Sequence, residues 1–336
     1  RITAGNRIGV CTFQGGVNAA GMQYAYAGMA QAFEDGSPVL CITDGVPIGS
    51  SGNSQFDVAS SMKTVSKWFG YIDKPERVPE FMRRAFTMLR SGRPGPVILA
   101  VPDPTGTYDE TADPYVNVKG WKSAPDPTDV RAAADLLLKA QNPLIYAGEG
   151  VIYANASEEL KSLAELVNAP VISTLKAKGA FPENHPLFVG VRGDHVSNYL
   201  DKSDLVLAVG SSLSPGRFSH GIPNAATKTI IHCNVDELHV NKVYSTAQAV
   251  IGDARFTLQA LANEVSSRTS EVKRNSEAVA IEVKLERDAG LEIYPNVPPT
   301  ATIDSITPSP ARFDAEITFS GSGSDSDGTV VAYEWT

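Results

Sequence analysis

The sequence is poor in cysteine, in basic charge and in long apolar runs. Only three of its 336 residues are cysteines, and Cys11, Cys41 and Cys233 lie far apart. This odd, widely spaced set does not fit the disulfide framework of a small secreted protein, and it predicts buried free thiols in a reducing, cytoplasmic setting. The net charge of -9 argues against a nucleic-acid-binding protein, and no apolar run approaches the roughly 20 residues of a membrane span.

Signatures of several catalytic classes are missing as well. The five histidines show no metal-ligand spacing, and there is neither a Gly-x-Ser-x-Gly elbow nor a Ser-His-Asp order. The run Asp325-Ser326-Asp327-Gly328 lacks the spacing of a calcium-binding EF-hand loop and predicts a hairpin turn. We therefore assign no catalytic residue and no metal ligand from these motifs. The chain opens on Arg1 without a signal peptide, so we expect the start of the protein to lie upstream.

What the sequence does contain, over residues 1–103, is an alternation of strand-like and helix-like segments. Short apolar runs predict buried strands at 7–13, 38–43 and 96–101, and helical spacing predicts helices at 18–33 and 79–89. Alternation of this kind is typical of a parallel sheet that helices cover on both faces. Residues 1–103 therefore predict a doubly wound α/β domain.

A second alternation follows a proline-rich linker at 104–127. Residues 128–265 predict another doubly wound, mostly parallel α/β domain, with strands at 143–147, 170–174, 204–209, 229–233 and 249–251 and with helices at 129–140, 157–168 and 255–265. We expect Ser157 to cap the second of these helices, with Glu158 and Glu159 in its first turn.

The last part of the chain changes character. Residues 266–293 are charged and helix-prone without a wide apolar face, which predicts a solvated, poorly packed connecting helix. Residues 294–336 are rich in Pro, Ser, Thr, Gly and Asp, and the alternating runs 315–319 and 329–333 predict strands of a partial all-β module.

Glycine-rich turns after predicted strands are the candidate binding elements. The turn Gln14-Gly15-Gly16-Val17-Asn18 opens a helix, and it fits either a cofactor-binding turn or a plain tight turn. The loop 49–57 fits either a surface loop or a loop that aims Gln55 and Phe56 at a site. The turns 148–150 and 210–212 follow strands of the second domain, where open α/β sheets bind ligands.

Several of these segments together resemble the thiamine-diphosphate-dependent enzyme family, in particular acetolactate synthases. Residues 1–103 look like the pyrimidine-binding domain, most specifically at Ser91-Gly92-Arg93-Pro94-Gly95-Pro96-Val97. Residues 128–262 look like the central domain, most strongly over 174–186 (TLKAKGAFPENHP). The tail 298–335 is similar to the opening of a PKD domain, an immunoglobulin-like sandwich. We expect a fusion of unrelated pieces near residue 293.

The resemblance implies thiamine diphosphate with Mg²⁺ as cofactor of the complete parent. Gln14, Gly15, Gly16 and Asn18 would line the aminopyrimidine pocket, and Gln55 and Phe56 resemble, in inverted order, the Phe-Gln pair of acetolactate synthases. The family also uses a glutamate that would lie upstream of residue 1 and a Gly-Asp-Gly motif that occurs nowhere here. The resemblance therefore predicts a fragment that is inactive alone. FAD or ADP is not expected, because Ser212-Leu213-Ser214-Pro215-Gly216-Arg217 replaces the Arg-Phe-Asp-Asp-Arg run and Asn234 stands where Asp is common.

Three functional hypotheses follow. The first is a fragment of a 2-oxo acid decarboxylase or carboligase, a lyase or transferase that forms a homodimer or homotetramer in the cytoplasm. The second is a non-catalytic nucleotide-binding protein that uses the central domain. The third is a secreted adhesion protein with PKD modules, for which the β tail would indicate an extracellular location.

Overall fold

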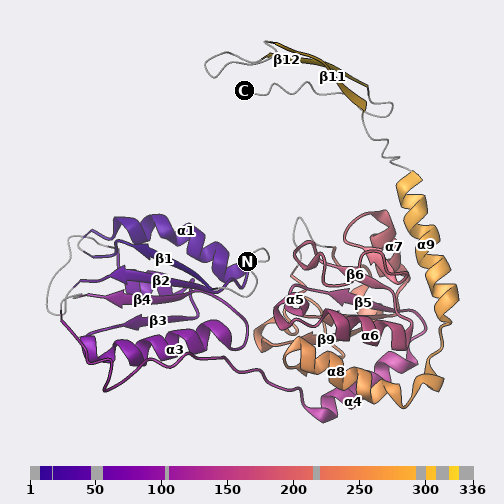
Figure 1. The fold of residues 1–336 in the computed structure, drawn as a ribbon. Helices are drawn as coiled ribbons and strands as arrows, with labels where there is room; N and C mark the ends of the chain where they lie inside the picture. The colour runs from indigo at the N-terminus through magenta and orange to yellow at the C-terminus, as the bar shows by residue number, and fades with distance from the viewer. Residues whose placement is uncertain are drawn as a thin grey trace.

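A computed structural model describes residues 8–16, 18–46, 56–102, 106–214, 220–292, 300–307 and 318–324. Two parallel sheets, each flanked by helices, account for most of these residues, and a two-stranded antiparallel sheet follows near the C-terminus (Figure 1). This confirms the predicted class of two parallel-sheet α/β units.

The first sheet has four parallel strands in the order β1-β2-β4-β3. Its strands are β1 (Gly9–Phe13), β2 (Val39–Asp44), β3 (Trp68–Tyr71) and β4 (Val97–Val101). Its helices are α1 (Ala20–Glu34), α2 (Val58–Lys63) and α3 (Val78–Arg90), with a 3-10 turn at Pro75–Arg77. We call this part of the chain the N-terminal unit.

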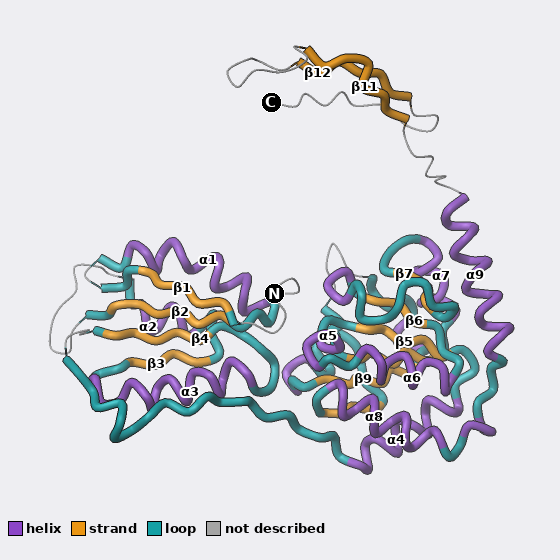
Figure 2. The backbone as a smooth tube through the Cα atoms, in the orientation of Figure 1, coloured by secondary structure: helices purple, strands orange, loops and turns teal. Residues whose placement is uncertain are grey.

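Helices cover the two faces of this sheet with two separate apolar clusters. Helix α1 lies on one side of the strands and α3 on the other (Figure 2). Buried side chains of α1 and α2 pack with one face, and those of α3 pack with the other. The first cluster contains Met22, Met62, Cys41 and Ile98, and the second contains Phe81, Leu89, Leu40 and Leu99. The edge strand β1 is less well covered, and its Val10 side chain is 62% exposed.

The second sheet has six parallel strands in the order β10-β9-β8-β5-β6-β7. They are β5 (Pro143–Ala147), β6 (Val171–Ser173), β7 (Phe188–Gly190), β8 (Leu205–Val209), β9 (Thr229–Asn234) and β10 (Gln248–Ile251). The chain leaves β5 toward one edge and returns at β8 to build the other. The boundary between β5 and β8 is therefore a topological switch point.

Helices and short turns connect these strands and complete what we call the central unit. The helices are α4 (Pro127–Lys139), α5 (Gly150–Ala154), α6 (Ser157–Val167), α7 (Asp194–Lys202) and α8 (Ala254–Ser266). The 3-10 turns are Leu175–Ala177, Ala225–Thr227, Glu237–His239 and Thr269–Glu271.

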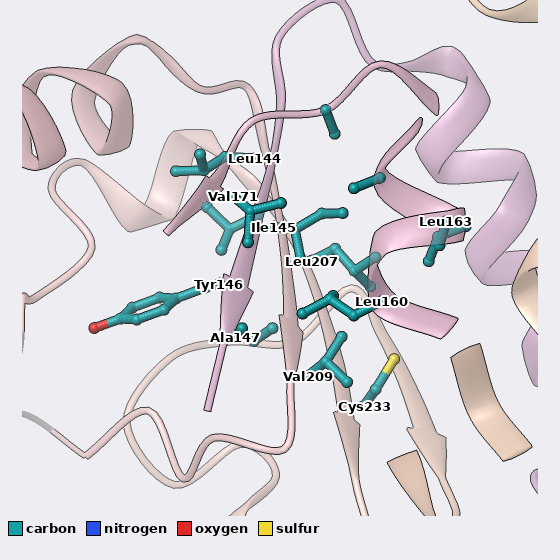
Figure 3. Packing of buried hydrophobic residues seen from close by; sticks show 14 of the residues in the cluster. Leu144, Ile145, Tyr146, Ala147, Leu160, Leu163, Val171, Leu207, Val209 and Cys233 are labelled. Carbon is teal, nitrogen blue, oxygen red and sulfur yellow. The ribbon is translucent and has the colours of Figure 1, made fainter. Parts of the chain in front are cut away.

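One continuous core holds the central unit together. Ile145 on β5, Leu207 on β8 and Leu160 on α6 are each fully buried, and they converge with their neighbours between sheet and helices (Figure 3). Strands buried on both faces read as uninterrupted apolar runs, which is why 143–147 and 204–209 were predictable as strands.

Two details differ from the sequence-based expectations. The edge strands β3 and β7 were not predicted, because each is short and its residues are not all buried. Ser157 does not cap α6: the N-cap position is Ala156, and no side chain caps it. Glu158 and Glu159 do occupy the first turn, where Glu159 pairs with Arg255 at 2.7 Å.

The charged connecting helix is also better packed than predicted. Helix α9 spans Ser276–Glu292, and its Val279 and Val283 are 0% and 1% exposed within the central core. Two valines four residues apart form one narrow apolar stripe, and through this stripe the helix packs against the central unit. Asn198 on α7 adds a hydrogen bond to Glu286 on α9 at 3.2 Å.

Beyond α9, strands β11 (Thr300–Thr307) and β12 (Thr318–Ser324) pair antiparallel. The predicted strand at 315–319 overlaps β12 only at its end, and the predicted strand at 329–333 lies outside the described residues. The PKD resemblance stays a prediction.

Candidate functional site

The turn between β1 and α1 lies where strands β1 and β2 end. The Gly15 N–H donates a hydrogen bond to the Asp44 carboxylate at the end of β2. A Cβ atom on Gly15 would stand 2.2 Å from the Thr43 hydroxyl oxygen, and one on Gly16 would stand 2.3 Å from Asp44 Oδ2. A side chain at either position would therefore displace Thr43 or Asp44. Asp44 was not singled out from the sequence, although its place after a buried strand was a usable signal.

Gln14 closes the start of helix α1. Its backbone carbonyl accepts a hydrogen bond from Met22 N–H at 2.9 Å, and its side-chain oxygen accepts a long one from Gly21 N–H at 3.5 Å. Two of the amide groups that a helix N-terminus would otherwise offer to an anion are therefore already satisfied. The structure gives Gln14 a positioning role in the turn.

Asn18 and Ala19 complete the turn in a strained form. The Asn18 side-chain oxygen accepts a hydrogen bond from Ala20 N–H at 3.3 Å. The Asn18 backbone carbonyl accepts one from the Gln23 side-chain amide at 3.3 Å. Ala19 adopts φ 52°, the left-handed region that costs an alanine roughly 1–2 kcal/mol. Strain of this kind often marks a functional turn.

Of the Gln55 and Phe56 pair, the structure describes Phe56 alone, and Gln55 lies outside the described residues. Phe56 packs against the cluster under α1 that contains Met22 and Met62. The next residue, Asp57, accepts a hydrogen bond from Ser60 N–H at 3.0 Å and so begins α2. Hydrogen bonds from Ser60 hold the pKa of Asp57 below its usual value.

The family resemblance implies that these residues hold one half of a cofactor. The absent Cβ atoms of Gly15 and Gly16 leave room for Thr43 and Asp44 of the chain itself, so the two glycines let the turn pack against the end of β2. The described residues contain no cluster of three or more His, Cys, Asp or Glu side chains that could hold a metal ion. The pyrimidine-binding role of the turn stays a prediction, and no described residue is assigned to the diphosphate or to Mg²⁺.

A second candidate site is a cavity of about 750 Å³ between the central unit and the N-terminal unit. Turns that follow β5, β6, β8 and β9 line it from one side, and residues 34–36 and 92–94 line it from the other. The cavity thus opens at the carboxyl edge of the six-stranded sheet, over the switch point between β5 and β8. In open α/β sheets this is where ligands bind.

Glycine backbones form the floor of this cavity. Gly150 N–H donates to Gly210 O at 2.9 Å, and a Cβ on Gly148 would stand 2.3 Å from that same oxygen. Gly210 has φ +64°, and a Cβ there would stand 2.8 Å from Gly150 Cα. The turns at 148–150 and 210–212, weak candidates from sequence alone, are thus packed against each other at the switch point.

The cavity wall carries more positive than negative side chains. Its cationic residues are Arg90, Arg93, Lys119, Lys122, Lys176 and Lys242, and its carboxylates are Glu34, Asp35, Glu149 and Asp253. Two buried ring nitrogens there, His220 Nε2 and His239 Nδ1, have no hydrogen-bond partner among the described residues. Burial lowers the pKa of His239, and the positive charge of Arg93 lowers it further. A polar ligand in this cavity would meet neutral imidazoles and several cations.

Ion pairs tie the two units together beside the cavity. Lys176, in the 174–186 segment that carries the family resemblance, pairs with Asp35 at the end of α1. Arg93 lies 3.9 Å from Asp236 and donates to Glu34 O at 2.8 Å. The sequence alone did not indicate these contacts, because they join segments far apart in the chain.

Comparison with known proteins places these observations in context. Residues 130–261 match the family model described as thiamine pyrophosphate enzyme, central domain. The chain is 34% identical over 275 residues to the probable acetolactate synthase large subunit of Methanocaldococcus jannaschii, covering 77% of this chain and 46% of that protein. It is 31% identical over 271 residues to glyoxylate carboligase of Escherichia coli O157:H7, covering 78% and 45%.

Solved structures agree on the fold. Benzoylformate decarboxylase from Polynucleobacter necessarius superposes with a TM-score of 0.64 at 19% identity, covering 80% of this chain and 51% of that one. At this identity the likeness concerns the fold alone. The chain spans about half the length of the relatives it matches. Among the described helices, none combines the length and the apolar character needed to cross a membrane.

Proposed function

This chain belongs to the thiamine-diphosphate-dependent enzyme family of the acetolactate synthase type, and we propose that it carries two units of a 2-oxo acid carboligase or decarboxylase. The observation that carries the proposal is the continuous match of 275 residues, which extends beyond the central unit to most of the chain. The two relatives compared above are named a synthase and a carboligase, so the reaction class we favour is carbon–carbon bond formation.

In this proposal the β1–α1 turn supplies one wall of the aminopyrimidine pocket. Gly15 and Gly16 let the turn pack closely against the end of β2, Asp44 fixes it from β2, and Gln14 fixes it from the helix side. The bound cofactor would supply a carbon nucleophile and an electron sink for carbanion chemistry at the 2-oxo carbon. The residues of this chain would position the ring and exclude water from it.

Calorimetric titration of the purified chain with thiamine diphosphate and Mg²⁺ tests the proposal. We expect binding that Gly16→Val weakens by about tenfold or more, equivalent to about 1.4 kcal/mol, because the new side chain displaces Asp44 and distorts the turn. Gly28→Val is the matched control, since a Cβ at that exposed position of α1 meets nothing within 4 Å. Equal affinities for both variants, or no binding to the wild type at millimolar cofactor, would contradict the proposal.

Activity forms a separate question. The sequence-based hypothesis that this chain is inactive by itself stays a prediction, and so does the homodimer or homotetramer. Release of CO₂ from pyruvate or glyoxylate, with thiamine diphosphate and Mg²⁺ present, would refute the hypothesis of inactivity. If Gly28→Val still released CO₂ and Gly16→Val did not, the activity would depend on the β1–α1 turn.

A second function, nucleotide binding in the central unit, is favoured by the cavity at the switch point. Its cations suit phosphate groups, and it lies at the carboxyl edge of the sheet. Titration with ADP, FAD and NAD would test it, with Lys242→Ala in the cavity wall expected to weaken binding and Lys63→Ala, outside the cavity, as the control. Failure of all three nucleotides at millimolar concentration would agree with the sequence-based expectation that FAD and ADP do not bind.

A further inference from the structure

Two of the three cysteines lie directly opposite each other on neighbouring strands. In the parallel pair β1 and β2, Cys11 is in register with Cys41. Both side chains belong to the same apolar cluster beneath helix α1, so they point to the same face of the sheet. Each sulfur is free, and the Cys11 thiol donates a long hydrogen bond to Leu40 O, next to Cys41, at 3.9 Å. Cys41 is fully buried, whereas Cys11 is partly exposed at the edge of the sheet.

The register brings the two residues within reach of a covalent bond. Adjacent strands lie about 4.8 Å apart, and disulfides join residues whose Cα atoms are roughly 4.4–6.8 Å apart. A bond between these cysteines therefore requires side-chain rotation and a small closing of the Cβ atoms, with no change of register. The third cysteine, Cys233 on β9, is in register with Val209 and Val250 and has no such partner.

We propose that Cys11 and Cys41 form a redox-active pair that a small peroxide converts to a cross-strand disulfide. The sulfur of Cys11, the more exposed residue, attacks a peroxide oxygen, the O–O bond breaks, and one water leaves after protonation. The product is a sulfenic acid on Cys11. The sulfur of Cys41 then attacks that of Cys11, the S–O bond breaks, and a second water leaves. Two thiols are oxidised and one hydrogen peroxide is reduced to two waters.

The position of the pair links this oxidation to the β1–α1 turn. Cys11 lies three residues before Gln14, and Cys41 lies three residues before Asp44. A disulfide would therefore join the two strands whose ends carry the hydrogen bond between Gly15 and Asp44. Oxidation should stiffen the base of the turn and raise the midpoint of unfolding of the N-terminal unit, because the bond closes a long loop. The proposal does not depend on the proposed cofactor.

The reaction should be slow at neutral pH and faster in alkali. Burial raises the pKa of both thiols, and that of Cys41 reaches about 12, so thiolate is scarce at pH 7. Because the thiolate is the nucleophile, the rate of oxidation should rise steeply between pH 7 and pH 9. A surface thiol of ordinary pKa would show a smaller rise over this range.

The test is oxidation of the whole chain with excess hydrogen peroxide, followed by differential alkylation and peptide mass mapping. We expect a peptide that links Cys11 to Cys41 within one chain, reversal by dithiothreitol, and loss of two of the three titratable thiols. Cys233→Ser should form the same link. Cys41→Ser should instead leave a sulfenic acid on Cys11 that dimedone traps.

Two results would overturn the proposal. One is peroxide treatment that leaves Cys11 and Cys41 as free thiols at pH 9 while a model thiol is consumed. The other is a disulfide that joins separate chains, seen as a dimer on a non-reducing gel and abolished by Cys11→Ser. Should Cys41→Ser fail to fold, Cys11→Ser at the partly exposed position serves in its place, with loss of the linked peptide as the expected result.

Discussion

The two parallel sheets differ in how completely they are covered. In the N-terminal unit, two small clusters lie on opposite faces of four strands, and the edge strand leaves Val10 62% exposed. In the central unit, six strands and their helices share one continuous core that reaches as far as α9. Stability follows the apolar area removed from water, so the central unit should be the more stable of the two.

The difference also shows how each unit presents a candidate site. The N-terminal unit fixes its turn by polar contacts between Gly15, Asp44 and Gln14. The central unit fixes its turns by direct packing of glycine backbones at 148, 150 and 210. A Cβ atom at Gly15 or Gly16 would first meet side-chain atoms of Thr43 or Asp44, whereas one at Gly148 or Gly150 would meet the backbone of Gly210, which cannot rotate away. Substitutions at the central site should therefore cost more stability.

The largest effect is expected from core truncation. Leu207→Ala on β8 should destabilise the central unit by about 3–4 kcal/mol, because Leu207 is fully buried and its neighbours cannot fill the space. The matched variant Leu99→Ala should act on the N-terminal unit alone. Urea unfolding can separate the two in a Trp121→Phe, Trp335→Phe background, where the remaining Trp68, stacked on Phe81 at 5.8 Å, reports on the N-terminal unit.

The residues of the central unit include no tryptophan, so hydrogen exchange of its amides reports on it. If each variant shifted the fluorescence transition and the hydrogen-exchange transition by the same amount, the two units would unfold as one. The predicted difference in stability between the units would then be wrong.

The next effect concerns the glycine floor of the cavity. Gly210→Ala should cost roughly 1–3 kcal/mol more than Gly179→Ala, because both positions have positive φ but only Gly210 lacks space for a Cβ. Thermal unfolding of the two variants measures the difference. Equal costs would mean that backbone conformation alone, and no close packing, requires glycine at 210.

Helix α9 provides a smaller effect. Val279→Ala should destabilise the central unit by about 2 kcal/mol, because this valine is fully buried against the core. Ile281→Ala, at a position 54% exposed on the same helix, should stay within about 0.5 kcal/mol of the wild type. Similar small changes in both variants would support the solvated helix that the sequence predicted.

The smallest effect is a difference in response to acid. Burial lowers the pKa of His195, His220, His232 and His239, all of which lie in the central unit. The unfolded chain therefore binds more protons than the folded one as the pH falls below about 6.5, so folding weakens. Residues 1–103 contain no histidine. Between pH 7 and pH 5.5 the urea midpoint should fall for the central unit and change less for the N-terminal unit.

The sequence predicted most of the fold where burial was complete. Strand β5 was predicted with its final bounds, because all five of its residues are apolar and buried. Short edge strands such as Trp68–Tyr71 were missed, since four residues carry too little periodicity. Helix α9 was misjudged, because Val279 and Val283 are only two residues in a charged segment.

The sites were less predictable than the fold. The β1–α1 turn was visible as a glycine run after a strand, but its partner Asp44 lies 29 residues from Gly15 in the chain. The turns at 148–150 and 210–212 were named separately, but the cavity was not predicted. The two turns lie side by side because β5 and β8 are neighbours in the sheet, and that strand order cannot be read from the sequence. The pairing of β5 with β8 forms one wall of the cavity, and residues of the N-terminal unit such as Arg93 form the other.

Saturation-transfer NMR of thiamine diphosphate with the whole chain tests the central claim most directly. If the β1–α1 turn holds the aminopyrimidine, the pyrimidine methyl and ring protons should receive the strongest saturation, and Gly16→Val should reduce it while Gly28→Val does not. Uniform saturation along the cofactor, or saturation that Gly16→Val leaves unchanged, would contradict the claim that this turn is the pyrimidine site.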